Sequence, residues 1–174
     1  MILLPQLLTL SGSGQNCGKT SSACLLIDKF ISLQPIAVKI SPHFHHYSSG
    51  KLCFSVKGKY EIYQEVLDNT SKDSSRMLKA GASKVFYMQV KDRNLEEAFS
   101  LILTEIKDRP IICESGGLHK HFKPGLQLFF YKDIIPSTKS NSYVPDLKIQ
   151  FNPDTIQHHL CPIEFSNKSW QLVF

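Results

Sequence analysis

The chain has 174 residues, 42% of them hydrophobic and 20% charged, which is ample for one domain with a real hydrophobic core. No stretch approaches the roughly 18 apolar residues of a transmembrane helix, and residues 1–8 lack the basic flank of a signal peptide, so we expect them to begin a first strand. The net charge of +5 comes from dispersed cations, which argues against nucleic-acid binding and suits either an anionic ligand such as a nucleotide or a plain solvated surface.

Apolar periodicity predicts alternating strands and helices. In chain order, the pattern predicts a strand at 7–10, a helix at 19–32, a strand at 35–40, a hairpin or extended insert at 51–63, a helix at 73–80, a strand at 84–90, a helix at 95–107, and strands at 110–113, 126–131, 147–151 and 170–174, the last two closing the sheet edge.

This order of elements predicts an α/β fold of three layers, with a mostly parallel twisted sheet and helices on both faces. We expect a single domain over residues 1–174, with a small hairpin insert at about 48–66. Ligands of such folds bind at the carboxyl ends of the strands, and the motifs described next all fall there.

The most specific motif is Ser11-Gly-Ser-Gly-Gln-Asn-Cys-Gly-Lys-Thr20, between the first strand and the first helix. In such a phosphate-binding loop, backbone N–H groups bind phosphate oxygens, Lys19 reaches the β and γ oxygens, and the Thr20 hydroxyl ligates Mg²⁺. The loop is one residue longer than a strict Walker A sequence. The predicted nucleotide contacts here are Gly12, Ser13, Gly14, Gln15, Asn16, Cys17, Gly18, Lys19, Thr20 and Ser21.

An acidic motif, Cys113-Glu-Ser-Gly-Gly117, follows the buried strand at 110–113. Glu114 stands where a Walker B acid would hold Mg²⁺ or orient a nucleophile, and Gly116 would let the backbone approach a phosphate. Lys19 and Glu114 are therefore the predicted catalytic residues, and Thr20 and Glu114 the predicted metal ligands. A purely structural glycine turn is the alternative.

Lys39 ends the second predicted strand and is expected to touch a phosphate. The loop after it holds His43, His45 and His46, a spacing that suits a metal, a phosphate contact or proton transfer, with a solvated loop as the alternative.

The predicted helix at 73–80 offers Arg76 to an anion. Asp73 or Ser74 is expected to cap this helix at its N-terminus, and Gly81 to end it.

Taken in order, the segments 12–20, 39–46, 72–82 and 113–117 resemble the molybdopterin-guanine dinucleotide biosynthesis protein B family over about residues 7–131. The Lys-Asp-Ser-x-Arg segment ending in Ala-Gly-Ala is the most specific part. The resemblance implies a dimeric P-loop NTPase that binds GTP with Mg²⁺, hydrolyses it slowly, and assists the nucleotidyltransferase that attaches GMP to molybdopterin. Lys39, His43 and Arg76 would face that cofactor.

Other features leave alternatives open. The longer loop is similar to that of dethiobiotin synthetase and cobyrinic acid synthase relatives, which favours an ATP-dependent ligase or kinase; a nucleotide-binding protein without turnover is a third option. The segment 138–141 resembles a guanine-reading element, but its last residue is Asn and lacks the required carboxylate. Residues 170–174 would suit an edge strand or a subunit contact.

The five cysteines are odd in number and no two lie two to four residues apart. This pattern excludes a disulfide framework and a zinc ribbon, and it predicts a protein of the reducing cytoplasm.

Overall fold

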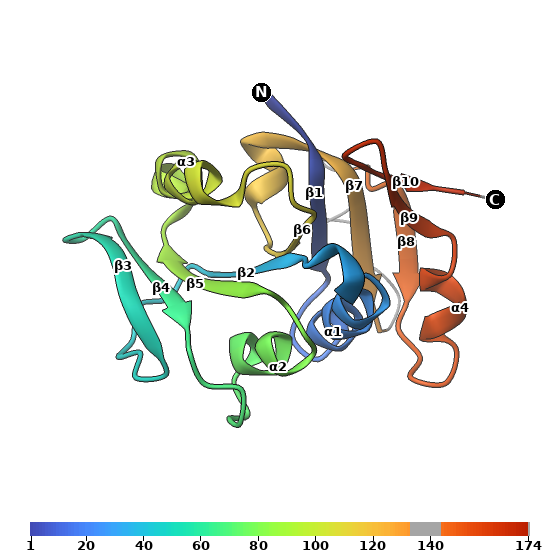
Figure 1. Cartoon of the computed structure of the whole chain (residues 1–174), viewed down its shortest axis with the longest axis horizontal. Helices are drawn as coiled ribbons and strands as arrows, with labels where there is room; N and C mark the ends of the chain where they lie inside the picture. The colour runs from blue at the N-terminus through green and yellow to red at the C-terminus, as the bar shows by residue number, and fades with distance from the viewer. Residues whose placement is uncertain (133–143, 174) are drawn as a thin grey trace.

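A computed structural model describes residues 1–132 and 144–173. The strands of its main sheet are β1 (Ile2–Gly12), β2 (Ile36–Ser41), β3 (Gly50–Val56), β4 (Tyr60–Glu65), β5 (Lys84–Val90), β6 (Ile111–Glu114), β7 (Phe122–Tyr131) and β8 (Leu147–Gln150). They lie in the order β3-β4-β5-β2-β6-β1-β7-β8 (Figure 1).

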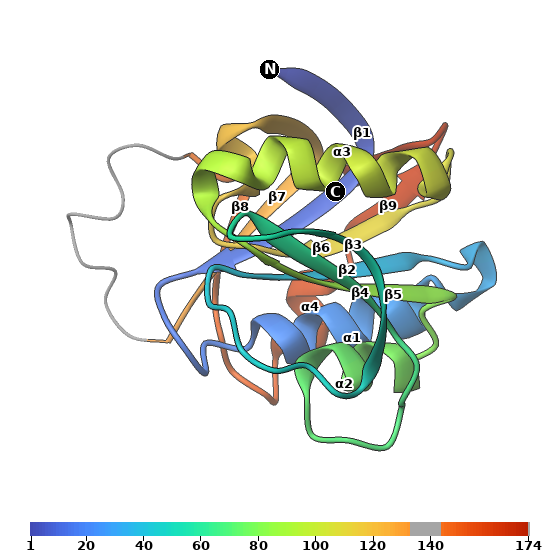
Figure 2. The ribbon, with the colours of Figure 1, turned by 90° about the vertical axis from the view of Figure 1, so that its left-hand side faces the viewer.

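The six strands from β5 to β8 in this order run parallel, and β4 and β3 add an antiparallel hairpin at one edge. Helices α1 (Lys19–Lys29), α2 (Asp73–Lys79) and α4 (Ile156–Leu160) cover one face of the sheet, and α3 (Leu95–Ile106) covers the other (Figure 2). The predicted fold class, a mostly parallel α/β sheet between two helical layers, is thus confirmed.

Alternation along the strands divides the apolar side chains between two cores. In β1, Leu8 and Leu10 point into the core beneath α1, whereas Leu7 points into the core beneath α3. Each helix packs on its core through an apolar stripe. In α1, Ala23, Leu26 and Ile27 are buried at the spacing of one helix face. Burial on both faces of the central strands explains why they read as continuous apolar runs.

The end of the chain departs from the prediction. The strand predicted at 170–174 does not close the main sheet. Within the described residues, β10 (Ser169–Leu172) pairs with β9 (Ile163–Ser166) in a separate two-stranded antiparallel sheet. Trp170 is 1% exposed and its indole N–H donates to the Gln6 carbonyl at 2.8 Å, so its large ring fills the core. Neither α4 nor β9 was predicted.

Smaller differences concern element ends. Helix α1 ends at Lys29, and residues 31–33 form a separate 3-10 turn, whereas β7 begins at Phe122, earlier than predicted. Gly81 does follow α2 in the left-handed region, at φ +101°.

The segment 138–141 lies outside the described residues. In the parts of the chain that the structure describes, no helix is long and apolar enough to cross a membrane.

Candidate functional site

Residues 12–20, which run from the end of β1 into the first turn of α1, are here called the P-loop. Gly18 lies in the left-handed region, at φ +86°, just before the first residue of α1. At Gly12 the backbone passes so close to its neighbours that an added Cβ would lie 2.6 Å from Cys17 Sγ and 2.7 Å from the Phe130 carbonyl oxygen. The Ser13 N–H donates to that same carbonyl at 2.9 Å. Both glycines are therefore required by the path of the loop.

A cavity of about 600 Å³ opens at the carboxyl ends of β1, β2 and β6, beside the P-loop. Most of the predicted contacts line it, namely Gly12, Gln15, Asn16, Cys17, Gly18, Lys19, Thr20, Ser21, Lys39, Arg76, Glu114 and Gly116. Ser13, Gly14 and His43 are not among the described residues that do so. Four segments that are distant in sequence thus meet around one space of the size expected for a small-molecule site.

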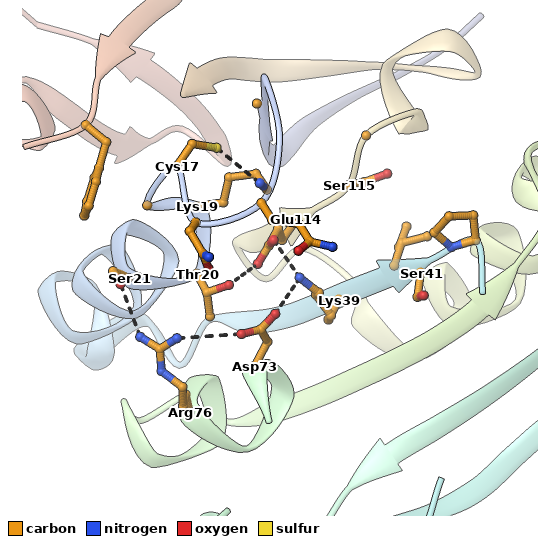
Figure 3. A pocket seen from close by; sticks show the side chains of 18 residues that line it. Cys17, Lys19, Thr20, Ser21, Lys39, Ser41, Asp73, Arg76, Glu114 and Ser115 are labelled. Atoms are coloured by element: carbon orange, nitrogen blue, oxygen red, sulfur yellow. Dashed lines mark hydrogen bonds and ion pairs between the residues drawn. The ribbon is translucent and has the colours of Figure 1, made fainter. Parts of the chain in front are cut away.

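An ionic cluster occupies the floor of the cavity (Figure 3). The Lys39 ammonium, at the end of β2, lies 2.6 Å from Glu114 Oε1 and 2.8 Å from Asp73 Oδ2. The Thr20 hydroxyl donates to the other Glu114 oxygen at 2.6 Å. Glu114 is almost fully buried, so its carboxylate depends on these two partners.

The ionisation of this cluster follows from its geometry. Burial by itself would lower the pKa of Lys39, but the Glu114 and Asp73 carboxylates outweigh it and hold the pKa above its ordinary value. Burial would raise the pKa of Asp73, but hydrogen bonding to Lys39 and the positive charge of Lys39 lower it overall. Both groups are therefore charged at neutral pH.

Two more cations border the cavity. Arg76, on α2, has one guanidinium nitrogen 3.6 Å from Asp73 Oδ1 and donates from another to the Ser21 hydroxyl at 3.2 Å. The Lys19 ammonium bends back onto its own loop and donates to the Gly14 carbonyl at 2.6 Å.

Asp73 has a different position from the one predicted. Neither Asp73 nor Ser74 caps α2, because the N-cap residue is Lys72 and no side chain makes a capping hydrogen bond. Asp73 turns toward Lys39 instead, and the Ser74 hydroxyl donates to the buried carboxylate of Glu65 at 2.8 Å. Burial and opposite charge decide these side-chain directions, whereas a cap would satisfy only backbone groups at an exposed helix end.

Sequence reasoning also missed Phe151, which follows β8 and lines the cavity. Asp73 could have been found, because it directly precedes the Ser-x-Arg pattern that already pointed to the ligand. No local signal marks Phe151 as a site residue, since the sequence places it only at the end of the predicted strand at 147–151.

The histidine loop lies apart from the P-loop cavity. His45 packs beside Tyr87, with its Nε2 3.3 Å from the Tyr87 hydroxyl, and its backbone N–H donates to Gln89 at 2.5 Å. His43, His45 and His46 do not come together as metal ligands. In the described ranges, no three histidine, cysteine, aspartate or glutamate side chains lie close enough to hold a metal ion.

Comparisons with known proteins find a similar solved structure but no matching family or curated sequence. A scan against protein-family models and a search of curated proteins each find no match. Among solved structures, the chain is similar to the apo form of LpxK from Aquifex aeolicus in complex with ATP, with a TM-score of 0.45 and 17% identity over 74% of this chain. The chain spans only 39% of the length of that protein.

Proposed function

We propose that this protein binds a nucleoside triphosphate together with Mg²⁺ at the P-loop and acts as a slow nucleoside triphosphatase. One observation carries the proposal: Lys19 and Thr20 of the P-loop share a single cavity with Lys39, Asp73 and Glu114, which come from three other segments. A glycine-rich turn without a ligand would not require these charges to converge.

The donor set fits Mg²⁺. This ion prefers hard oxygen ligands and is usually held by one or two carboxylates together with substrate phosphates. Thr20 supplies a hydroxyl that is hydrogen-bonded to Glu114, and Glu114 and Asp73 supply carboxylates that both contact a cation, the Lys39 ammonium. When bound, the ion would neutralise charge that develops on the transferring phosphate.

The cations of the site would bind and polarise the phosphates. Among the described lining residues, Lys19, Lys39 and Arg76 are positive and only Asp73 and Glu114 are negative. Lys19 would exchange its bond to the Gly14 carbonyl for phosphate oxygens, in a loop whose backbone already has the left-handed turn at its end. Fixed positive groups of this kind stabilise the transition state of phosphoryl transfer electrostatically.

For the biological role, we propose a GTP-binding accessory protein of molybdopterin guanine dinucleotide formation. The four segments that carry the family resemblance all contribute side chains to the one cavity, which supports this assignment. A homodimer, a molybdopterin ligand and a nucleotidyltransferase partner belong to the same proposal. All five cysteines are free thiols, which is compatible with action in the cytoplasm.

A second candidate is an ATP-dependent ligase or kinase of the dethiobiotin synthetase type, favoured by the extra residue of the P-loop. The two candidates differ in nucleotide and in the second substrate, so they can be separated by binding and turnover. A nucleotide-binding protein without turnover is the remaining outcome.

Calorimetric titration with GTP and with ATP, each with Mg²⁺, tests the proposal. We expect Lys19→Ala to weaken binding at least about tenfold, because the ammonium contacts phosphate directly. The matched control is Lys51→Ala, an exposed lysine on β3 that does not line the cavity. Undiminished binding by the Lys19 variant would refute the site.

Phosphate release then assigns the role. GTP turnover that rises with molybdopterin or the nucleotidyltransferase would support the accessory protein. Turnover of ATP that depends on a small carboxylic acid would favour the ligase, and binding with no release would leave a regulatory nucleotide.

A further inference from the structure

The two sides of the P-loop differ in chemistry. In the sheet order, β6 and β2 lie on one side of β1, and β7 and β8 lie on the other (Figure 1). Glu114 ends β6 and Lys39 lies two residues before the end of β2, so the ionic cluster occupies the first side. On the second side, the residue that follows β8 and reaches the cavity is Phe151.

This asymmetry gives a bound nucleotide a direction. The proposed Mg²⁺ ligands Thr20 and Glu114 must lie near the terminal phosphates, which places that end of the ligand toward β6. The opposite end, with the sugar and the base, then extends toward β8.

Phe151 is held firmly at this second end. Its backbone N–H donates to the Tyr131 carbonyl at 2.7 Å, and its partly buried ring packs on the core beneath α1. The ring also lies against the P-loop, because a Cβ added at Gly18 would fall 1.9 Å from Phe151 Cδ2. Cys17, Ile40 and Pro42 also line the cavity, but Phe151 is the aromatic ring among its described lining residues. A rigid aromatic ring on a cavity wall is the kind of surface on which proteins stack bases.

We propose that Phe151 is the stacking platform for the nucleobase. The inference rests on the proposed function and adds the base subsite to it. Every base has an aromatic face, so stacking on Phe151 strengthens the binding of GTP and ATP alike, and the choice between them must come from other groups.

The test compares ligands with and without a base. Wild type, Phe151→Ala and Phe151→Tyr are titrated with GTP, ATP and inorganic tripolyphosphate, each with Mg²⁺. We expect Phe151→Ala to weaken both nucleotides about 5- to 50-fold while tripolyphosphate changes less than about twofold, and Phe151→Tyr to retain nucleotide binding. Phe165→Ala is the matched control, since Phe165 is partly buried against the same core but is not among the described residues lining the cavity.

The outcomes separate the two levels of proposal. If Phe151→Ala weakens tripolyphosphate as much as the nucleotides, the ring merely supports the loop and the base subsite is refuted; unchanged binding of all three ligands also refutes it. If wild type binds none of them, the proposed function falls and the subsite with it. Phe151→Trp gives a second readout that does not need an alanine variant to fold: its new indole emission should change with GTP or ATP and not with tripolyphosphate.

Discussion

Replacing Lys39 by methionine removes the ammonium between Glu114 and Asp73 while keeping most of the side-chain volume. At 2.6 Å and an effective dielectric constant of about 20, the attraction between Lys39 and Glu114 is about 6 kcal/mol before desolvation is counted. The Asp73 side chain is 39% exposed, so solvent screens its pair with Lys39 and we assign it at most about 1 kcal/mol. The Glu114 pair therefore dominates.

The net loss is smaller than the gross attraction, since the buried ions also pay for desolvation. Removing one partner of a buried pair costs about 3–5 kcal/mol, and we expect about 3 kcal/mol for Lys39→Met without Mg²⁺, or an unfolding constant about a hundredfold larger. Adding Glu114→Gln should recover much of this loss, because no carboxylate is then left uncompensated. Mg²⁺ should also stabilise Lys39→Met more than wild type, because the divalent ion can replace the missing cation.

Urea unfolding followed by circular dichroism, with and without Mg²⁺, measures these free energies. The raised pKa of Lys39 means that its contribution is present throughout neutral pH and is lost only as the pH rises through that raised value, so pH 7.5 suits the assay. Wild-type stability in Lys39→Met, or a loss that Glu114→Gln does not reduce, would refute the reasoning.

Gly18→Ala should lower the free energy of unfolding by about 2 kcal/mol or more and impair nucleotide binding, because φ is +86° and the new Cβ would meet the Phe151 ring. A double-mutant cycle with Phe151→Ala that gives no coupling energy would contradict this contact. Glu65→Gln should lower the free energy of unfolding by about 2 kcal/mol at pH 7, since this buried carboxylate accepts hydrogen bonds from the Tyr47 and Ser74 hydroxyls, among others. Burial would raise the pKa of Glu65, but these bonds lower it overall, so its contribution is lost as the pH falls through that lowered value and the two proteins should converge in acid. Urea midpoints from pH 7 to pH 3 test this, and a constant difference would count against it.

Features written in adjacent residues could be predicted. The P-loop lies between a strand and a helix because its glycines, its lysine and its threonine are consecutive, and the apolar periods of the flanking elements are local. Glu114 could be anticipated for the same reason, because it directly ends a buried apolar run.

Features that depend on which strands become neighbours could not. Asp73 was expected at a helix cap, but β2 lies next to β6 and so carries Lys39 to a place where it attracts both Glu114 and Asp73. Trp170 was expected at the sheet edge, but its ring finds a core position and a carbonyl partner on β1.

The sequence alone therefore determined the glycine-rich loop between the first strand and the first helix, the α/β class and most elements, because short-range periodicity and consecutive side chains specify them. The tertiary structure decided that Lys39 neutralises two carboxylates, and that Phe151 lines the cavity against Gly18. Those contacts join residues as far apart in the chain as Gly18 and Phe151. Their energy comes from burial and charge pairing, which act only after the strand order has brought the segments together.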